Sequence, residues 1–291
     1  MVKMRKLRSR EQIDFSRIDP DHHILWPEEK TNWNFSRVSG DTYSNYLETY
    51  LKSYLPLCLG ELRKHDPNYK EIKVFDFGCG FGPMAYSTYL LSNTVETSVE
   101  YVGLDIRKDA IEWLSTRYKN IKSHSFIHND VPAEYDYISA GQFGRPTSST
   151  SEKGEEGQFS IGSSHNIQWS SSVFTHMTYQ GALNALESIS ANASEKSVQL
   201  NSWLIVDDIS LLGMHIGIAD RQLPHDMGDF LTNNTLSPLE CTAFKQNIIF
   251  DLYHRAGLEI IDIEYGGWRN KSKPNTKTNH YQDIIISRKI I

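Results

Sequence analysis

Short apolar runs, each ending in polar residues or glycine, recur from residue 70 to the end of the chain. Five of them read VFDF at 74–77, YVGLDI at 101–106, SFIHND at 125–130, NIQW at 166–169 and WLIVDD at 203–208. Runs of this length that alternate with longer helix-like segments are typical of parallel strands in βαβ units. Two further runs, at 258–263 and 282–287, predict a last pair of strands. The pattern therefore predicts one α/β domain, and 291 residues are enough to bury its core.

The N-terminal part of the chain has a different pattern. It begins with polar, irregular sequence in which Trp26 and Trp33 are aromatic anchors, and this predicts an arm that packs on the domain. From Thr42 to Leu55 the apolar and aromatic side chains recur at helical spacing, at Tyr43, Tyr46, Leu47, Tyr50, Leu51, Tyr54 and Leu55. We expect Pro56 to break or end this helix. The chain is thus divided into an arm with a helix at 1–65 and a domain at 66–291.

A glycine-rich turn follows the first apolar run. Asp76 is followed by glycine at every second position, Gly78, Gly80 and Gly82, and then by Pro83. Such a turn between a strand and a helix brings backbone N–H groups close to a nucleotide-like ligand without obstruction by Cβ atoms. The dinucleotide fingerprint G-x-G-x-x-G would need glycine or alanine where Pro83 stands, so the turn does not predict binding of NAD.

This turn resembles motif I of the class I S-adenosylmethionine (SAM) dependent methyltransferases, and the resemblance extends over about residues 70–291. It implies a Rossmann-like sheet of seven mostly parallel strands, with helices on both faces and an antiparallel last strand. It also implies SAM as the cofactor. An apolar stripe such as that of the N-terminal helix is more often plain core packing, but the resemblance makes this helix a lid over the cofactor cleft. Residues Ser172 to His176 are similar to members that methylate sugars and other small metabolites. The chain departs from the pattern at Asn166 or Gln168, where many members have an aspartate.

The resemblance also assigns the cofactor-binding residues. They are Asp76, Gly78, Cys79, Gly80, Phe81 and Gly82 in the turn, Asp105 and Ile106 after the second run, Asn129 and Asp130 after the third, Ser171 after the fourth, and Tyr43 in the lid. Asp105 would accept hydrogen bonds from the ribose hydroxyls, although it could instead cap the next helix, at 108–118. Asp130 or Asn129 would read the adenine edge, and Tyr43 would contact the methionine end.

Methyl transfer to a hydroxyl requires a group that removes the proton. His176, directly after the fourth run, is the first candidate for this base. His225 with its neighbour Asp226, and Asp208 with its neighbour Asp207, are the other candidates. No further acid completes a ligand set around the last pair, so we expect no metal site.

Two long connections separate the predicted strands. Residues 139–164 are rich in Gly, Ser and Glu and predict a flexible loop, either a substrate-side flap or an inert insertion. Residues 208–237 follow the fifth run and predict an insertion beside the acceptor. The sequence Ser237-Pro238-Leu239-Glu240 then resembles a helix start and predicts a helix through Arg255, ending at Gly257.

Composition narrows the classes of ligand and the cellular compartment. A net charge of −6 and a pI near 6.0 argue against broad nucleic-acid binding. The three cysteines, Cys58, Cys79 and Cys241, have no spacing typical of zinc sites, so a reducing cytoplasm is predicted. No apolar run approaches the ~18 residues that a membrane span needs. Whether the chain forms a homo-oligomer is left open.

The predicted function is SAM-dependent O-methylation of a sugar, glycan precursor or similar small hydroxylated acceptor. The chain has no Asn/Asp-Pro-Pro-Tyr/Phe motif of N-methyltransferases and no Pro-Cys nucleophile of cytosine C5 methyltransferases. Two alternatives remain. One is N- or C-methylation of a small metabolite or a protein, and the other is a non-catalytic SAM-binding regulatory subunit.

Overall fold

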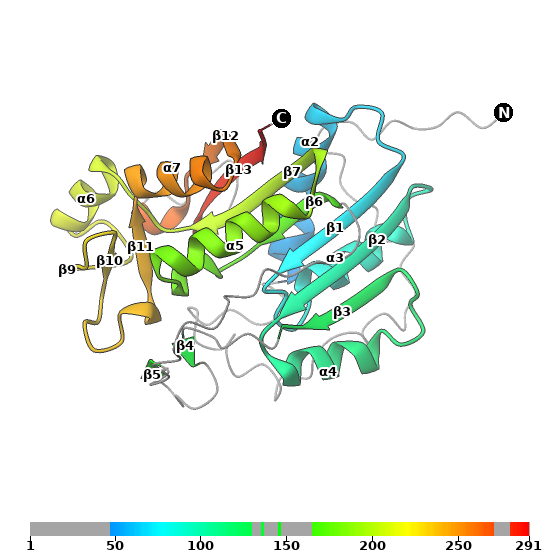
Figure 1. Cartoon of the computed structure of the whole chain (residues 1–291), viewed down its shortest axis with the longest axis horizontal. Helices are drawn as coiled ribbons and strands as arrows, with labels where there is room; N and C mark the ends of the chain where they lie inside the picture. Colours follow the sequence, from blue (N-terminus) through cyan, green and yellow to red (C-terminus); the bar gives the residue numbers. More distant parts are fainter. Residues whose placement is uncertain (1–46, 130–134, 137–144, 147–164, 271–279, 291) are drawn as a thin grey trace.

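The computed structural model describes residues 47–129, 135–136, 145–146, 165–270 and 280–290. Its centre is a sheet of seven strands in the order β12-β13-β7-β6-β1-β2-β3 (Figure 1). The strands are β1 Glu71–Phe77, β2 Ser98–Asp105, β3 His124–His128, β6 His165–Ser170, β7 Ala193–Trp203, β12 Leu258–Glu264 and β13 Asp283–Lys289. β13 pairs antiparallel with both neighbours, and the pairs from β7 to β3 are parallel. The expected sheet with an antiparallel last strand is confirmed.

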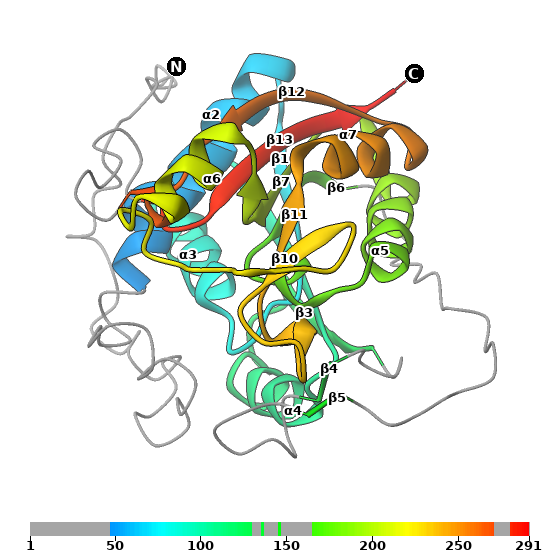
Figure 2. The same cartoon turned by 90° about the vertical axis from the view of Figure 1, so that its left-hand side faces the viewer.

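Helices cover both faces of this sheet, as expected (Figures 1 and 2). One face carries α2 Leu55–His65, α3 Pro83–Ser92 and α4 Lys108–Arg117, and the other carries α5 Tyr179–Ala191 and α7 Gln246–Arg255. In β1, Ile72 and Val74 pack on the first face, whereas Phe75 and Phe77 pack on the second. Because β1 is buried on both faces, its carboxyl end holds the glycine-rich turn in a fixed place.

The N-terminal helix does not end at Pro56. Residues 47–49 are helical, Tyr50–Tyr54 form a π-helical segment named η5, and α2 continues directly from Leu55. Pro56 stands in the first turn of α2, where a missing N–H and a fixed φ are tolerated. The prediction was wrong because the proline falls at the junction of the π-helical and α-helical segments, where it does not interrupt the α-helical ladder.

The fifth strand of the sheet lies earlier in the chain than predicted. β7 ends at Trp203, and Ile205–Val206 form a separate strand, β8. β7 contains the buried polar side chains Gln199, Asn201 and Ser202. These residues interrupt the apolar pattern, and the prediction therefore placed the strand on the next apolar run, at 203–208.

A second, four-stranded sheet follows. Its order is β8-β11-β10-β9, with β9 His225–Asp226, β10 Phe230–Thr232 and β11 Thr242–Lys245, and α6 Asp208–His215 comes after β8. We call it the inserted sheet. It lies beyond the carboxyl end of β7, because β8 begins directly after that end (Figure 1). Ligands of open α/β sheets bind beyond the carboxyl ends of the strands. The acceptor-side role of residues 208–237 is consistent with this place and stays a prediction.

The residues at 237–240 do not begin α7. Pro238–Glu240 form a short 3-10 turn, η7, which leads into β11, and α7 begins at Gln246. The helix-start pattern is local, whereas β11 forms because it pairs with β8 and β10 from elsewhere in the chain. The predicted end is right: the helix stops at Arg255, and Gly257 has a positive φ of 69°.

The remaining predicted segments are covered only in part. β4 Tyr135–Asp136 and β5 Arg145–Pro146 form a small antiparallel pair. The rest of the predicted flexible loop at 139–164 lies outside the described residues, as does the arm up to residue 46. Across the described part of the chain, no helix combines the length and apolar character needed to cross a bilayer. Cytoplasmic location stays a prediction, and the oligomeric state stays open.

Candidate functional site

The three glycines of the turn all have left-handed backbone conformations. Their φ angles are 79° at Gly78, 52° at Gly80 and 74° at Gly82. A Cβ at Gly78 would lie 2.2 Å from Val173 Cγ2, and one at Gly82 would lie 2.7 Å from Leu114 Cδ2. Among the described residues, no atom lies within 4 Å of a Cβ at Gly80. The turn is therefore packed against protein at both ends and open in its middle, where a ligand can approach the backbone.

Asp105 ends β2, and its carboxylate is hydrogen-bonded to the open position of the turn, Gly80. Gly80 N donates to Oδ2 at 2.7 Å, and Arg107 N donates to Oδ1 at 2.8 Å. Burial raises the pKa of the carboxyl, and these two backbone bonds oppose the rise. A carboxylate has about four acceptor positions, so capacity remains for ribose hydroxyls. The alternative role as a helix cap is not observed, because Arg107 occupies the N-cap position of α4.

Asp76 and Cys79 support the turn from inside the domain. The Tyr101 hydroxyl donates to Asp76 Oδ2 at 2.6 Å, and Asp76 is only 2 % exposed. Burial raises the pKa of Asp76 to about 7, while the bond from Tyr101 opposes the rise. The Cys79 thiol is also buried, and burial raises its pKa. Both side chains thus face the core; the Asp76 backbone belongs to β1 and the Cys79 backbone to the turn.

Phe81 connects the turn to α4. The Arg107 guanidinium lies 4.8 Å from the centroid of the Phe81 ring, and the Trp113 ring meets the Phe81 ring edge-on, with centroids 5.9 Å apart.

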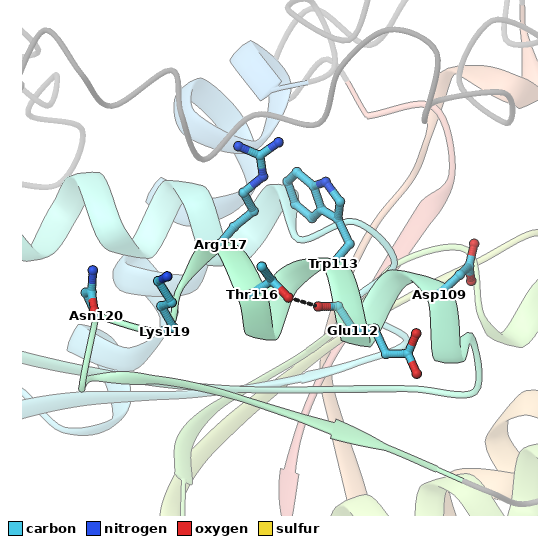
Figure 3. Close-up of a pocket in the computed structure, with 7 residues that line it drawn as sticks. All are labelled: Asp109, Glu112, Trp113, Thr116, Arg117, Lys119 and Asn120. Carbon is cyan, nitrogen blue, oxygen red and sulfur yellow. Dashed lines mark hydrogen bonds between the residues drawn. The ribbon is translucent and has the colours of Figure 1, made fainter.

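A shallow pocket lies on the outer surface of α4, where the side chains of Trp113 and Arg117 point the same way (Figure 3). Its lining is Asp109, Glu112, Trp113, Thr116, Arg117, Lys119 and Asn120. None of the predicted site residues belongs to it.

The residues predicted to surround the adenine meet where β2 and β3 end. Ile106 and Asn129 are half-buried, and Asn129 N donates to the Asp105 carbonyl at 2.9 Å. His128 Nε2 and the Ile106 carbonyl oxygen are hydrogen-bonded at 3.1 Å. The structure thus brings Ile106 and Asn129 to the same edge as Asp105. Asp130 and Tyr43 lie outside the described residues, so their predicted roles stay predictions.

The turn after β6 contains Ser172, to which the sequence assigned no individual role. Ser172 has a φ of 59°, which is uncommon for a residue with a Cβ. Its N–H donates to Ser202 Oγ at 2.7 Å, and Ser202 Oγ donates to Gln282 Oε1 at 2.6 Å. This relay joins the carboxyl ends of β6 and β7 to the start of β13. Ser171, the predicted cofactor contact, is half-buried in the same turn.

His176 ends η6 Phe174–His176, the 3-10 turn that follows β6. Its Nδ1 lies 3.0 Å from the Leu239 carbonyl, which accepts the hydrogen bond, so Nδ1 carries a proton. Burial lowers the pKa of His176 to about 4, the bond to Leu239 opposes this shift, and the charge of Arg221 adds to it. The imidazole is therefore neutral at pH 7, which is the form that can accept a proton.

His225 and Asp226 do not form the oriented pair that the sequence suggested. Both are exposed on β9. The Asp226 carboxylate accepts from Lys245 Nζ at 2.9 Å and from Gly228 N at 2.9 Å. The expected couple was wrong because neighbouring side chains on a strand point to opposite faces.

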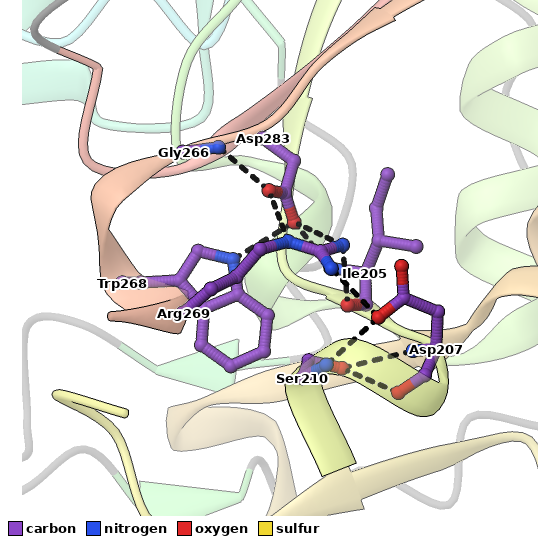
Figure 4. A network of polar contacts seen from close by, with 7 residues as sticks. All are labelled: Ile205, Asp207, Ser210, Gly266, Trp268, Arg269 and Asp283. Carbon is purple, nitrogen blue, oxygen red and sulfur yellow. Dashed lines mark hydrogen bonds and ion pairs between the residues drawn. The ribbon is translucent and has the colours of Figure 1, made fainter. Parts of the chain in front are cut away.

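Asp207 has a structural role next to the candidate Asp208. It is the N-cap of α6, and Arg269 Nη1 donates to its Oδ1 at 2.7 Å (Figure 4). Arg269 Nε also donates to Asp283 Oδ1 at 2.9 Å. Asp283 is fully buried and further accepts from Ile205 N, Gly266 N and Trp268 Nε1. The network joins β13, β8 and α6. Asp208 lies beside it, exposed in the first turn of α6.

No group of three or more His, Cys, Asp or Glu side chains in the described residues could hold a metal ion. Asp207 and Asp208 in particular do not converge with a third acid there. The cofactor-side residues do converge: the turn, Asp105, Ile106 and Asn129 lie at the carboxyl ends of β1, β2 and β3.

Comparisons with known proteins place the fold. No protein-family model matches the chain, and no curated protein is similar to it in sequence. Among solved structures, the PH0226 protein from Pyrococcus horikoshii OT3 is 13 % identical, with a TM-score of 0.51, over 91 % of this chain and 100 % of that one. A SAM-dependent methyltransferase from Clostridium acetobutylicum is 8 % identical, with a TM-score of 0.49, over 88 % and 96 %. Magnesium protoporphyrin IX methyltransferase from Synechocystis is 12 % identical, with a TM-score of 0.45, over 88 % and 89 %.

Of these three, only the PH0226 structure has a TM-score above 0.5, and at 13 % identity it shows likeness of fold and nothing finer. The seven-stranded sheet with its antiparallel last strand, the helices on both faces and the turn after β1 are those of a class I SAM-dependent methyltransferase fold. The chain has this fold.

Proposed function

We propose that the chain is a SAM-dependent methyltransferase that methylates a hydroxyl oxygen of a small acceptor, such as a sugar or a glycan precursor. The observation that carries this proposal is the open backbone at Gly80, bonded directly to the Asp105 carboxylate. An adenosine-containing ligand fits such a site, because the carboxylate accepts from ribose hydroxyls while the absence of a Cβ leaves room beside the turn.

In the proposed reaction, one set of residues binds the cofactor and another residue removes the proton from the acceptor. SAM supplies a methyl group on a positively charged sulfur. The turn and Asp105 would hold the ribose and the adjoining atoms, with Ile106 and Asn129 beside the adenine. His176, neutral at pH 7, would take the proton from the acceptor hydroxyl as the carbon–oxygen bond forms and the carbon–sulfur bond breaks. Orientation of the acceptor supplies the rest of the rate enhancement.

The proposal is tested with a panel of paired acceptors that differ only in carrying a hydroxyl or an amine at one position. Each pair is incubated with SAM and the full chain, and the products are identified by mass spectrometry. We expect an O-methylated product and the release of S-adenosylhomocysteine (SAH). An N-methylated product would contradict the oxygen acceptor, and SAH binding without turnover on any acceptor would support a regulatory subunit.

His176→Ala tests the base. Loss of a general base reduces turnover by about 10²-fold or more, whereas the affinity for SAH should stay within about twofold. His225→Ala is the matched control, since this histidine is exposed on β9. Equal turnover in His176→Ala and wild type would remove His176 from the mechanism.

A further inference from the structure

Arg221, on the segment between α6 and β9, is a charged side chain that takes no part in the steps above. Arg107, Arg269 and Arg288 each form an ion pair with a carboxylate. Within the described part of the chain Arg221 forms none, and its Nε donates instead to the Tyr281 hydroxyl at 3.1 Å. Asp220 attracts the Arg221 charge from the far side of the Tyr281 hydroxyl but forms no direct ion pair with it, so the terminal amino groups of the guanidinium are not held by a carboxylate of the described residues.

Tyr281 holds Arg221 in a defined orientation. Its hydroxyl accepts from Arg221 Nε and donates to Asp220 Oδ2 at 2.7 Å, and the guanidinium carbon lies 5.8 Å from the ring centroid. The backbone is fixed too, because Trp268 N donates to the Tyr281 carbonyl at 3.0 Å and Asp220 N donates to the Trp268 carbonyl at 2.8 Å. Since Nε serves for orientation, the two terminal amino groups can form the fork that binds carboxylate or phosphate.

The neighbours of this guanidinium belong to the acceptor side of the fold. Cys241 is buried in the apolar cluster against which Tyr281 packs, and Arg221 opposes the rise that burial causes in the pKa of its thiol. A thiol is a weak hydrogen-bond acceptor, which an oxyanion can replace. Leu239, two residues before Cys241, accepts from His176. Arg221 and His176 therefore border one region beyond the carboxyl end of β6.

We propose that Arg221 binds an anionic group, a carboxylate or a phosphate, on the acceptor whose hydroxyl is methylated. That the ligand is the acceptor rests on the proposed function, whereas the binding of an anion does not. The two acids in this region have other partners: Asp220 accepts from Tyr281, and Glu240 accepts from Asn234 Nδ2 at 3.2 Å. An anion held by the fork of Arg221 would set the position of the acceptor hydroxyl relative to the base.

The test titrates inorganic phosphate, and separately acetate, into the full chain with and without SAH. The arginine Nε–Hε and tyrosine resonances are followed by NMR. We expect a saturable shift of the Arg221 signal, and an affinity at least about tenfold weaker in Arg221→Gln, since charge-assisted hydrogen bonds are lost. Arg288→Gln, which removes an exposed ion pair with Glu259, should bind as wild type does. Tyr281→Phe keeps the ring, loses the orienting hydroxyl and should weaken binding several-fold.

The outcomes separate the possibilities. A response to acetate supports a carboxylated acceptor, and a response to phosphate alone supports a phosphorylated one. The absence of a saturable shift at Arg221, or equal loss in Arg221→Gln and Arg288→Gln, overturns the anion site. If phosphate binds at Arg221 but SAH does not bind the chain, the proposed function fails and the anion site stands.

Discussion

At the scale of single residues, the glycine-rich turn was predictable because its backbone requirement is visible in the residue types. Glycines are needed where φ is positive, and all three glycines of the turn have positive φ. Ser172 shows the opposite case. It adopts the same left-handed region through bonds to Ser202 and then Gln282, which are contributed by distant strands. No local pattern predicts such a residue, because long-range contacts create it.

Gly80→Val tests the open position of the turn, with Gly217→Val as its control. Both glycines have positive φ, 52° and 74°, and within the part of the chain that the structure describes neither has a neighbour within 4 Å of a Cβ. Both variants should therefore lose about 1–2 kcal/mol of unfolding free energy. Only Gly80→Val should also lose SAH binding, measured by calorimetry, because the new side chain occupies the ligand's place. SAH binding of wild-type strength in Gly80→Val would refute this.

Asp76 should make stability depend on pH. Burial raises its folded pKa to about 7, above the unfolded value of ~3.9, so between these values the folded state keeps a proton that the unfolded state has lost. The stability that the protonated Asp76 carboxyl contributes to the folded state is therefore fully present below the unfolded pKa. It is lost as the pH rises through about 7. Urea unfolding should show a larger loss of free energy from pH 5 to pH 8 in wild type than in Asp76→Asn. If the unfolding free energies of wild type and Asp76→Asn changed in parallel with pH, this would contradict the raised pKa of Asp76.

At the scale of elements, the sequence predicted which strands exist better than where they begin. β1, β2 and β3 were located correctly because their apolar runs end at the turn or at acids. β7 was misplaced because Gln199 and Asn201, though polar, are buried in the middle of the sheet. The inserted sheet was missed as well. Its strands are short, and they are held by pairing between segments far apart in the chain.

Asp283→Ala tests the network that joins the inserted sheet to the main sheet. The substitution leaves the Arg269 guanidinium buried with Asp207 as its remaining carboxylate partner. Breaking a buried pair in this way costs about 3–5 kcal/mol of unfolding free energy. Glu259→Ala, which removes an exposed pair with Arg288, should cost about 0.5 kcal/mol or less. Chemical denaturation measures both, and similar losses in the two variants would mean that the network contributes little.

At the scale of the whole molecule, the order of the motifs predicted the fold, whereas the residues that meet beside the predicted acceptor insertion could not be derived from the sequence. The cofactor-side residues come from one continuous set of βα units, and their spacing is preserved in the sequence. The acceptor side that we propose consists of η6, the segment around Arg221, residues 239–241 and the residues just before β13. In a chain with a net charge of −6, binding of an anion there would depend on this local arrangement and not on overall charge.

Binding of SAM by the turn and Asp105 is the central requirement of the proposed activity. Calorimetry with SAH and the full chain, compared with Asp105→Ala and Asp109→Ala, tests it. Asp109 is a matched control because it is the next acid along the chain and pairs with the Arg107 side chain. We expect one SAH to bind wild type and Asp109→Ala with similar affinity, and binding to Asp105→Ala to be weaker by about tenfold or more. No binding to wild type, or equal binding to all three proteins, would contradict the account.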